Sequence, residues 1–135
     1  MTHTAFSLLA LVGWSIALVL SLGTYRTVLV LKGKRAANSF NASGEDMDSL
    51  GKRLTRAHAN CYECLPLIAI VMLYAIATGQ AVVTDGLAFV VLGARMAQSI
   101  THIISTSPTF VLVRFAFFLV QMLVVIYWLT QLISI

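Results

Sequence analysis

The segment Arg53-Leu-Thr-Arg-Ala-His-Ala-Asn-Cys-Tyr-Glu-Cys-Leu-Pro66 joins a polar helix start to an apolar run that extends to about Ala77. Its polar side chains recur every three or four residues, at Arg53, Arg56, Asn60 and Glu63. At about 100° per residue of helix, these four fall within a quarter-turn of one another. Charges at the edge of an apolar span are costly. The segment therefore predicts a membrane helix with one polar stripe, which a simple anchor would not need.

The rest of the chain has the composition of a protein that lies within a bilayer. Of its 135 residues, 59% are hydrophobic and 10% are charged, whereas soluble domains carry about 25% charged residues. Apolar helices of about 20 residues span a bilayer, and four such stretches occur, at about residues 5–31, 48–78, 81–104 and 109–133. None has the alternation of a membrane β-barrel strand. We therefore expect an all-α membrane protein with a single domain over residues 1–135.

Loop lengths and charges predict the topology. The connections after the second and third spans are short, which makes neighbouring helices antiparallel and favours an up-down four-helix bundle. Six of the nine lysines and arginines lie in the Lys32–Arg56 loop, and the positive-inside rule places this loop in the cytoplasm and both termini outside. The first span lacks a signal-peptide cleavage pattern, and the lack of transit signals suits a bacterial inner membrane. Because no basic surface domain accompanies the net charge of +4, we expect no nucleic-acid partner.

Ionisable side chains of all four spans fall in the same half of the membrane. On the third span, Arg95, Gln98 and His102 share one face, and Arg114 lies about one turn into the fourth span. The only carboxylate within the spans on this side, Glu63, cannot neutralise the arginines that surround it. Unpaired buried charges cost several kcal/mol each. An anionic ligand would restore the balance, and arginine forks suit carboxylates.

Other interpretations of these charges remain open. Arg53 and Arg26 lie close enough to the membrane surface to extend to lipid phosphates. Glu63 has three candidate roles: it orients arginines through ion pairs, it binds the ammonium group of a ligand, or it relays protons. We favour the first role, because one acid among several arginines most simply acts as their counter-ion.

Cys61 and Cys64 form a C-x-x-C pattern, which in other settings indicates redox chemistry or a metal site. Here the pair lies on the reducing side of the membrane, and no second cysteine pair is present to accept electrons. With His58 the cysteines offer three zinc ligands and no fourth. We therefore predict no metal site, and we interpret both cysteines as small apolar residues in a helix interface.

The pattern Arg53-x-x-Arg56-Ala57-His58-x-Asn60-x-x-Glu63-x-x-Pro66 resembles the signature of the MAPEG family, the membrane-associated proteins in eicosanoid and glutathione metabolism. Chain length, four spans and a basic first loop fit this resemblance. It implies a homotrimer of four-helix protomers with glutathione as cosubstrate near the cytoplasmic face. It also implies thiol activation by Arg114 as the catalytic residue, because a nearby cation lowers a thiol pKa. The glutathione-binding residues that it implies are Arg53, Arg56, Asn60, Glu63, Arg95, Gln98 and His102.

The sequence also differs from the family pattern at some positions. His102 stands where a tyrosine is usual in the family, and no arginine follows Pro108 directly. The function that we expect is a glutathione-dependent transferase or peroxidase for lipophilic electrophiles, with a hydrophobic small molecule and membrane lipid as further partners. The alternatives are a non-catalytic binder of glutathione or anionic lipid, a small membrane exporter that uses Glu63, and a thiol-disulfide oxidoreductase that uses Cys61 and Cys64.

Overall fold

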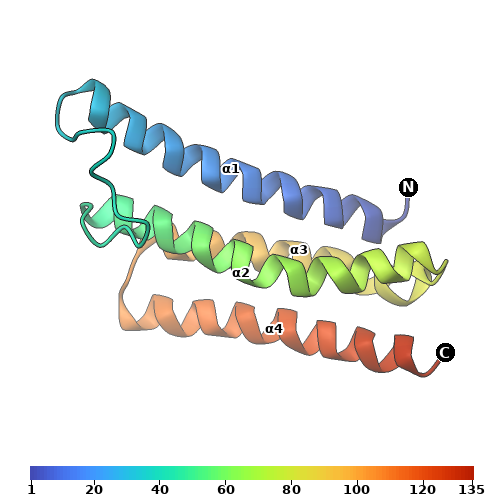
Figure 1. The fold of residues 1–135 in the computed structure, drawn as a ribbon. Coiled ribbons are helices and arrows are strands. Elements are labelled where there is room, and N and C mark those ends of the chain that lie inside the picture. The colour runs from blue at the N-terminus through green and yellow to red at the C-terminus, as the bar shows by residue number, and fades with distance from the viewer.

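The computed structural model describes all 135 residues and consists of four α-helices without strands (Figure 1). The helices are α1 (His3–Leu31), α2 (Ser49–Ala77), α3 (Ala81–Ile104) and α4 (Pro108–Ile133). Each is long and apolar enough to cross a membrane. The all-helical fold with four spans is therefore confirmed, and the observed helix ends differ from the predicted ones by two residues at most.

Local signals fix where the helices begin. Asp48 precedes α2, and its Oδ1 accepts a hydrogen bond from the backbone N–H of Gly51 at 2.9 Å. Its other oxygen accepts a hydrogen bond of 2.5 Å from the Tyr25 hydroxyl, which ties the end of α1 to the start of α2. Thr2 caps α1 with its side chain. Pro108 is the first residue of α4. The backbone N–H at this position has no partner within a helix, so a proline, which lacks that N–H, costs no helical hydrogen bond.

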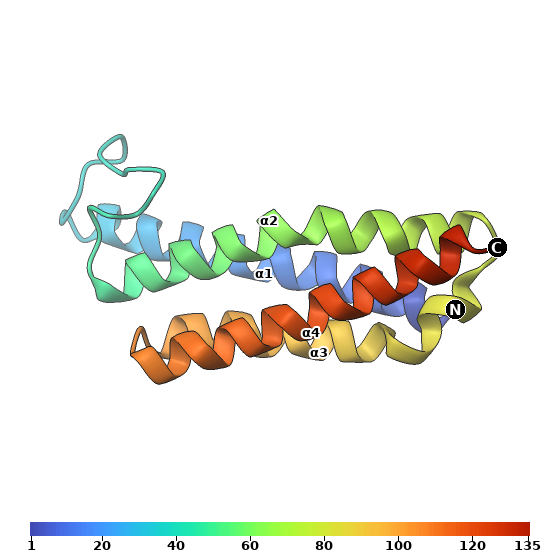
Figure 2. The ribbon, with the colours of Figure 1, turned by 90° about the horizontal axis from the view of Figure 1, so that it is seen from below.

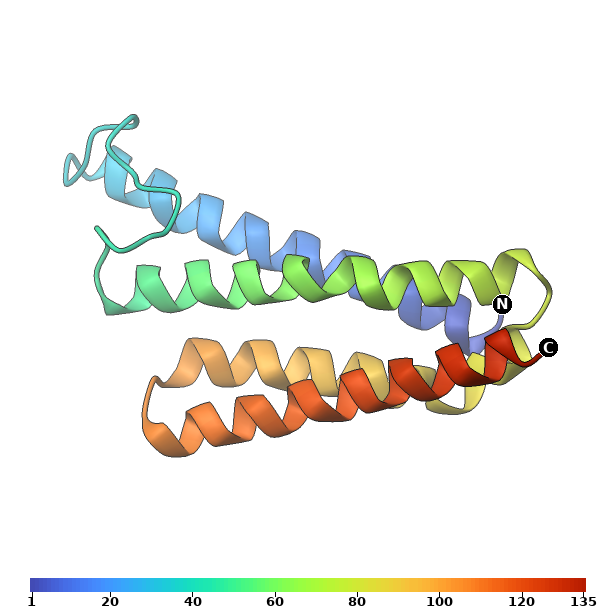
Figure 3. The same cartoon turned by 60° about the horizontal axis from the view of Figure 1, so that its bottom comes forward.

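The helices alternate in direction (Figure 2), and α2 and α3 lie between α1 and α4 (Figure 1). Helix α1 packs on both central helices, α4 packs mainly on α3, and α1 makes no contact with α4. Figure 3 shows the α1–α2 loop and the α3–α4 connection at one end, and both termini with the α2–α3 turn at the other. We call these the loop end and the termini end.

The apolar core occupies the half of the bundle nearest the termini. Its buried members are Leu8, Leu11, Ile68, Val71, Met72, Ala75, Ala88, Val91, Val125, Trp128 and Leu132. Only a small second cluster of Leu18, Ala57 and Cys61 is found nearer the loop end. Just 28 of the 135 residues are buried, because apolar side chains also cover the outside of the bundle, as a hydrocarbon environment favours. The buried polar side chains Arg95, Gln98 and Ser99 also lie in the loop half of the bundle.

At the termini end, a carboxylate joins α1 to α3. Asp85 Oδ1 accepts hydrogen bonds from the Thr4 backbone N–H at 2.8 Å and from the Thr4 hydroxyl at 2.6 Å. The Thr4 hydroxyl also lies 2.7 Å from that of Thr84. A negative charge at the first turn of a helix is favoured by the helix dipole. The single acid at this end therefore holds the start of α1 in place.

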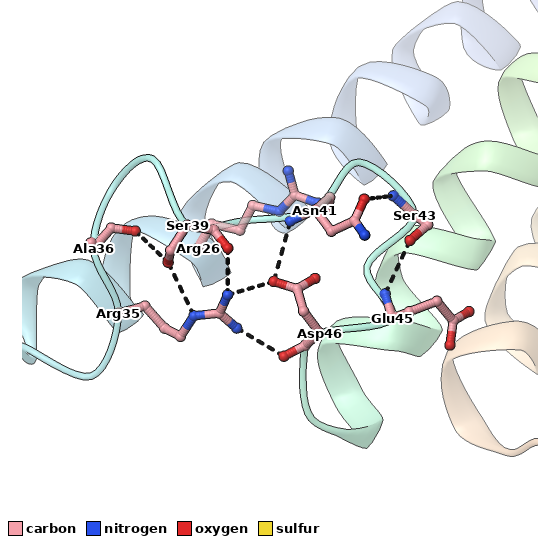
Figure 4. Close-up of polar contacts among 8 residues, drawn as sticks. All are labelled: Arg26, Arg35, Ala36, Ser39, Asn41, Ser43, Glu45 and Asp46. Carbon is pink, nitrogen blue, oxygen red and sulfur yellow. Dashed lines mark hydrogen bonds and ion pairs between the residues drawn. The ribbon is translucent and has the colours of Figure 1, made fainter.

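The α1–α2 loop is folded around Arg35 (Figure 4). The Arg35 guanidinium forms an ion pair with the Asp46 carboxylate and donates to the backbone carbonyls of Asp46, at 2.8 Å, and Ser39, at 2.6 Å. The guanidinium carbons of Arg35 and Arg26 lie 4.9 and 5.5 Å from the centre of the Phe40 ring, within the range of cation–π attraction. Arg26 thus has a partner within the protein.

Replacement of Asp46 with asparagine is expected to loosen this loop. Hydrogen bonding from Arg35 holds the pKa of Asp46 below its ordinary value of 3.8. The stabilising contribution of the carboxylate is therefore present above the ordinary value and is lost as pH falls through the lowered one. At neutral pH, we expect trypsin to cleave after Arg35 several-fold faster in D46N than in the unmodified protein. The matched variant E45Q removes the same charge without touching Arg35 and should change this rate less. Equal cleavage rates in D46N and the unmodified protein would exclude a role for the ion pair.

Candidate functional site

A cavity of about 560 Å³ lies at the loop end between α2, α3 and α4. This volume is typical of small-molecule sites. Its lining residues are Glu45, Ser49, Lys52, Arg53, Arg56, Asn60, Gln98, His102, Thr106, Val111, Arg114, Phe115 and Phe118. Four of them carry a permanent positive charge and one, Glu45, is acidic. The cavity is therefore strongly cationic, and an anion is the ligand that it favours.

Helix α2 supplies one wall, and its polar stripe divides into an inner and an outer part. Arg53 Nε donates to the backbone carbonyl of Ile103, in the last turn of α3, at 2.7 Å. Asn60, two turns later, also turns toward α3. Arg56 lies further out, where its Nη2 is 3.2 Å from Glu45 Oε1 of the loop. Arg56 therefore stands at the solvent side of the cavity, and Arg53 and Asn60 stand at its inner wall.

Arg95 is the most deeply buried charge in the protein, with 1% of its surface exposed. Its Nη1 donates to Asn60 Oδ1 at 3.0 Å and to the Asn60 carbonyl at 3.3 Å. Its Nε and Nη2 have no hydrogen-bond partner, and no carboxylate forms an ion pair with it. An uncompensated buried cation costs several kcal/mol. Arg95 does not line the cavity, but it lies directly behind Asn60, which does.

Helices α3 and α4 complete the polar wall. Arg114 Nη1 lies 3.0 Å from His102 Nδ1. Because a guanidinium only donates hydrogen bonds, Nδ1 must accept, and the ring then carries its proton on Nε2. One turn earlier on α3, Gln98 Oε1 accepts a hydrogen bond of 2.9 Å from Gln121 of α4. The apolar part of the lining is formed by Val111, Phe115 and Phe118 of α4.

The structure brings together six of the eight residues that the sequence marks as candidates. The six that line the cavity are Arg53, Arg56, Asn60, Gln98, His102 and Arg114, and Arg95 contacts one of them. Glu63 is the exception, because it is exposed, lies outside the cavity and forms no ion pair within the protomer. The predicted ion pairs between Glu63 and arginines are therefore not formed within the protomer. Glu63 lies about 60° around the helix from Asn60, so when Asn60 faces α3, Glu63 points outward.

Several lining residues were not among the candidates. Lys52 precedes Arg56 by one helical turn, so the same periodicity that marks the stripe could have found it. Val111, Phe115 and Phe118 have helical spacing beside Arg114 and form a recognisable apolar face. Glu45 carries no such signal, because its place at the cavity depends on how the α1–α2 loop folds.

The two cysteines lie apart from this site. Both are buried free thiols, and neither lines the cavity. Cys61 packs with Leu18 of α1 and Ala57 of α2. The interpretation of Cys61 as a small apolar residue in a helix interface is confirmed by this packing.

Comparisons with known proteins give one match. Neither a curated protein nor a solved structure matches the chain. The profile of the MAPEG family matches residues 4–134, a range that includes all four spans and every residue of the cavity. Such a match over nearly the whole length, together with the four apolar helices, shows that this chain is an integral membrane protein that belongs to the MAPEG family.

Proposed function

We propose that the protein is a glutathione-dependent transferase or peroxidase that acts on lipophilic electrophiles. The observation that carries this proposal is Arg95, a buried cation without a carboxylate partner, behind a cavity lined by four further cations. At neutral pH, glutathione carries two carboxylates and one ammonium group, so it offers the anionic oxygens that such a cavity needs. Membership of the MAPEG family supports glutathione-related chemistry.

In this proposal, different residues of the cavity bind different parts of the ligand. Arg56 and Lys52 attract the carboxylates at the mouth, Arg53 attracts them from the inner wall, and Asn60 and Gln98 hydrogen-bond the peptide part there. Binding of an anion here also relieves the uncompensated charge of Arg95. In the homotrimer that the family implies, the outward face of α2 lies against a neighbouring protomer. Glu63 would then supply the negative charge that the ligand ammonium requires.

The chemistry follows from the positions of Arg114 and the apolar part of the lining. A cation beside the thiol lowers the thiol pKa and so raises the thiolate fraction. The thiolate attacks an electrophilic carbon, a carbon–sulfur bond forms, and the leaving group departs with its electron pair. With a hydroperoxide, the thiolate attacks the terminal oxygen, a sulfur–oxygen bond forms, the oxygen–oxygen bond breaks, and the alkoxide leaves as an alcohol after protonation. A second glutathione then converts the sulfenic acid into the disulfide and water. Phe115 and Phe118 suit a lipophilic substrate that enters from the bilayer.

The proposed orientation places this chemistry at the cytoplasmic side. The loop end carries the excess of lysine and arginine, and the positive-inside rule assigns it to the cytoplasm with both termini outside. A bacterial inner membrane suits this arrangement, because glutathione and its reducing enzymes are then available at the cavity mouth.

The proposal is tested by measuring conjugation of glutathione to a lipophilic aryl halide, and reduction of a fatty-acid hydroperoxide, with purified protein in lipid vesicles. Activity that saturates with glutathione and depends on Arg114 supports an enzyme. Saturable glutathione binding without turnover of either substrate class would favour the non-catalytic binder. Absence of both binding and turnover would overturn the proposal.

Substitution of Glu45 with glutamine is expected to tighten glutathione binding about threefold, a change within the range of exposed ion pairs. Glu45 is the only acid in the cavity lining, and its carboxylate lies 3.2 Å from Arg56 and 4.0 Å from Lys52. It therefore competes with an incoming carboxylate for the same cations. Calorimetric titration of both proteins gives the two dissociation constants. Weaker binding in E45Q would show that Glu45 assists the ligand instead.

A further inference from the structure

A chain of hydrogen-bonded amides connects the backbone of α4 to the cavity. Gln121 is fully buried and does not line the cavity. Its Nε2 donates to the backbone carbonyl of Phe117 at 2.7 Å and to Gln98 Oε1 at 2.9 Å. Gln98 belongs to α3 and does line the cavity. A buried side chain outside the site thus holds a residue inside it.

Each link of this chain fixes the orientation of the next. A backbone carbonyl only accepts hydrogen bonds, so Gln121 must turn its NH2 group toward Phe117. The same NH2 group reaches Gln98, so Gln98 must present its oxygen to α4. With the opposite orientation, Gln121 would set its oxygen against two other oxygens. In the observed orientation, Gln121 Oε1 has no hydrogen-bond partner. This costs less free energy than the opposite orientation, in which acceptor oxygens would repel one another.

This orientation leaves the NH2 group of Gln98 for the cavity. That group donates no hydrogen bond within the protomer and is not among the buried polar groups that lack a partner. His102 lies one turn later on α3 and is oriented in the same way by Arg114. Arg114 donates a hydrogen bond to His102 Nδ1, so the Nε2–H of His102 remains available to the cavity. Donors on α4 therefore turn two residues of α3 into donors toward the ligand.

We propose that Gln121 is a positioning residue that orients Gln98 as a hydrogen-bond donor, so that the ligand presents a carboxylate or amide carbonyl oxygen to Gln98. The identity of this ligand as glutathione rests on the proposed function. The orientation of Gln98 does not, because it follows from contacts within the protein.

The first test is a double-mutant cycle on glutathione affinity with Q121L, Q98L and the double variant. Loss of a hydrogen bond to a charged or carbonyl oxygen predicts about tenfold weaker binding for Q121L. In the Q98L background, Q121L should change affinity less than about twofold, because its effect passes through Gln98. Q131L, which removes an exposed glutamine from the same helix, should leave affinity unchanged. An equal loss from Q121L in both backgrounds would show that Gln121 acts through packing alone, and this would overturn the proposal.

The second test needs neither a variant nor a ligand. The chain contains four glutamines, so selective ¹⁵N labelling gives four side-chain amide signals for NMR. In the unmodified protein without glutathione, we expect the NH2 protons of Gln121 to be protected from exchange and those of Gln98 to exchange with water in the cavity. The reverse order would overturn the proposal even if Q121L does not fold. If the NH2 protons exchange in the predicted order but the protein does not bind glutathione, the orientation of Gln98 is supported and the proposed function is rejected.

Discussion

Replacement of Arg95 with methionine is expected to weaken glutathione binding by roughly thirtyfold or more while raising the thermal stability of the ligand-free protein. Arg95 lies behind the cavity wall, but its buried charge attracts an anion in the cavity, and loss of an attraction between buried charges costs about 2–5 kcal/mol of binding. Without ligand, the substitution is expected to stabilise the protein, because Arg95 is 1% exposed and two of its nitrogens have no hydrogen-bond partner. Replacement of a buried ion pair by apolar side chains is neutral or stabilises proteins by about 1–4 kcal/mol, and we expect a gain in the same direction for a buried charge without a counter-ion.

The two effects are measured by glutathione titration and by thermal unfolding in the same detergent. K32M is the matched control, because it removes the same charge from an exposed position outside the cavity and should alter neither quantity. A lower unfolding temperature for R95M with unchanged affinity would mean that Arg95 serves the fold and not the ligand.

Substitution of Arg114 with methionine is expected to reduce kcat by about 10²–10³, which is typical for loss of one donor that stabilises a developing anion. The expected effect on KM is small, because Arg114 acts on the thiol and other cations hold the carboxylates. The ultraviolet absorbance of bound thiolate should appear only at higher pH in R114M than in the unmodified protein, because the cation that lowers the thiol pKa is gone.

A second cation of the same cavity separates thiol activation from general attraction of anions. K52M removes an equal charge near the mouth, and its main expected effect is a higher KM. If R114M and K52M gave the same changes in kcat and KM, the cavity would act only as a field of positive charge, and Arg114 would have no special role.

The sequence was sufficient to predict the fold, because its decisive features are local. Apolar runs of membrane length define four helices whatever their neighbours are, and Asp48 caps α2 through a contact three residues away. The positive loop and the short connections then determine the order of the helices. None of these inferences depends on how one helix is rotated against another.

The site was only partly predictable, because its contacts depend on that rotation. Periodicity placed Asn60 and Glu63 on one stripe, but only the packing of α2 on α3 turns Asn60 toward Arg95 and leaves Glu63 outside. The pairing of Gln98 with Gln121 likewise needs the register between α3 and α4. Glu45 depends on a loop whose shape is set by tertiary contacts, so no periodicity could have located it.

We propose that the cationic cavity binds glutathione through the carboxylates of the ligand. This is tested by calorimetric titration of the purified protein with glutathione and with its diethyl ester, because the ester keeps the thiol and the peptide but has no carboxylates. We expect saturable binding of glutathione at millimolar concentration or below, and much weaker binding of the ester. Absence of glutathione binding in this range, or equal binding of both compounds, would show that the cavity does not bind glutathione through its carboxylates.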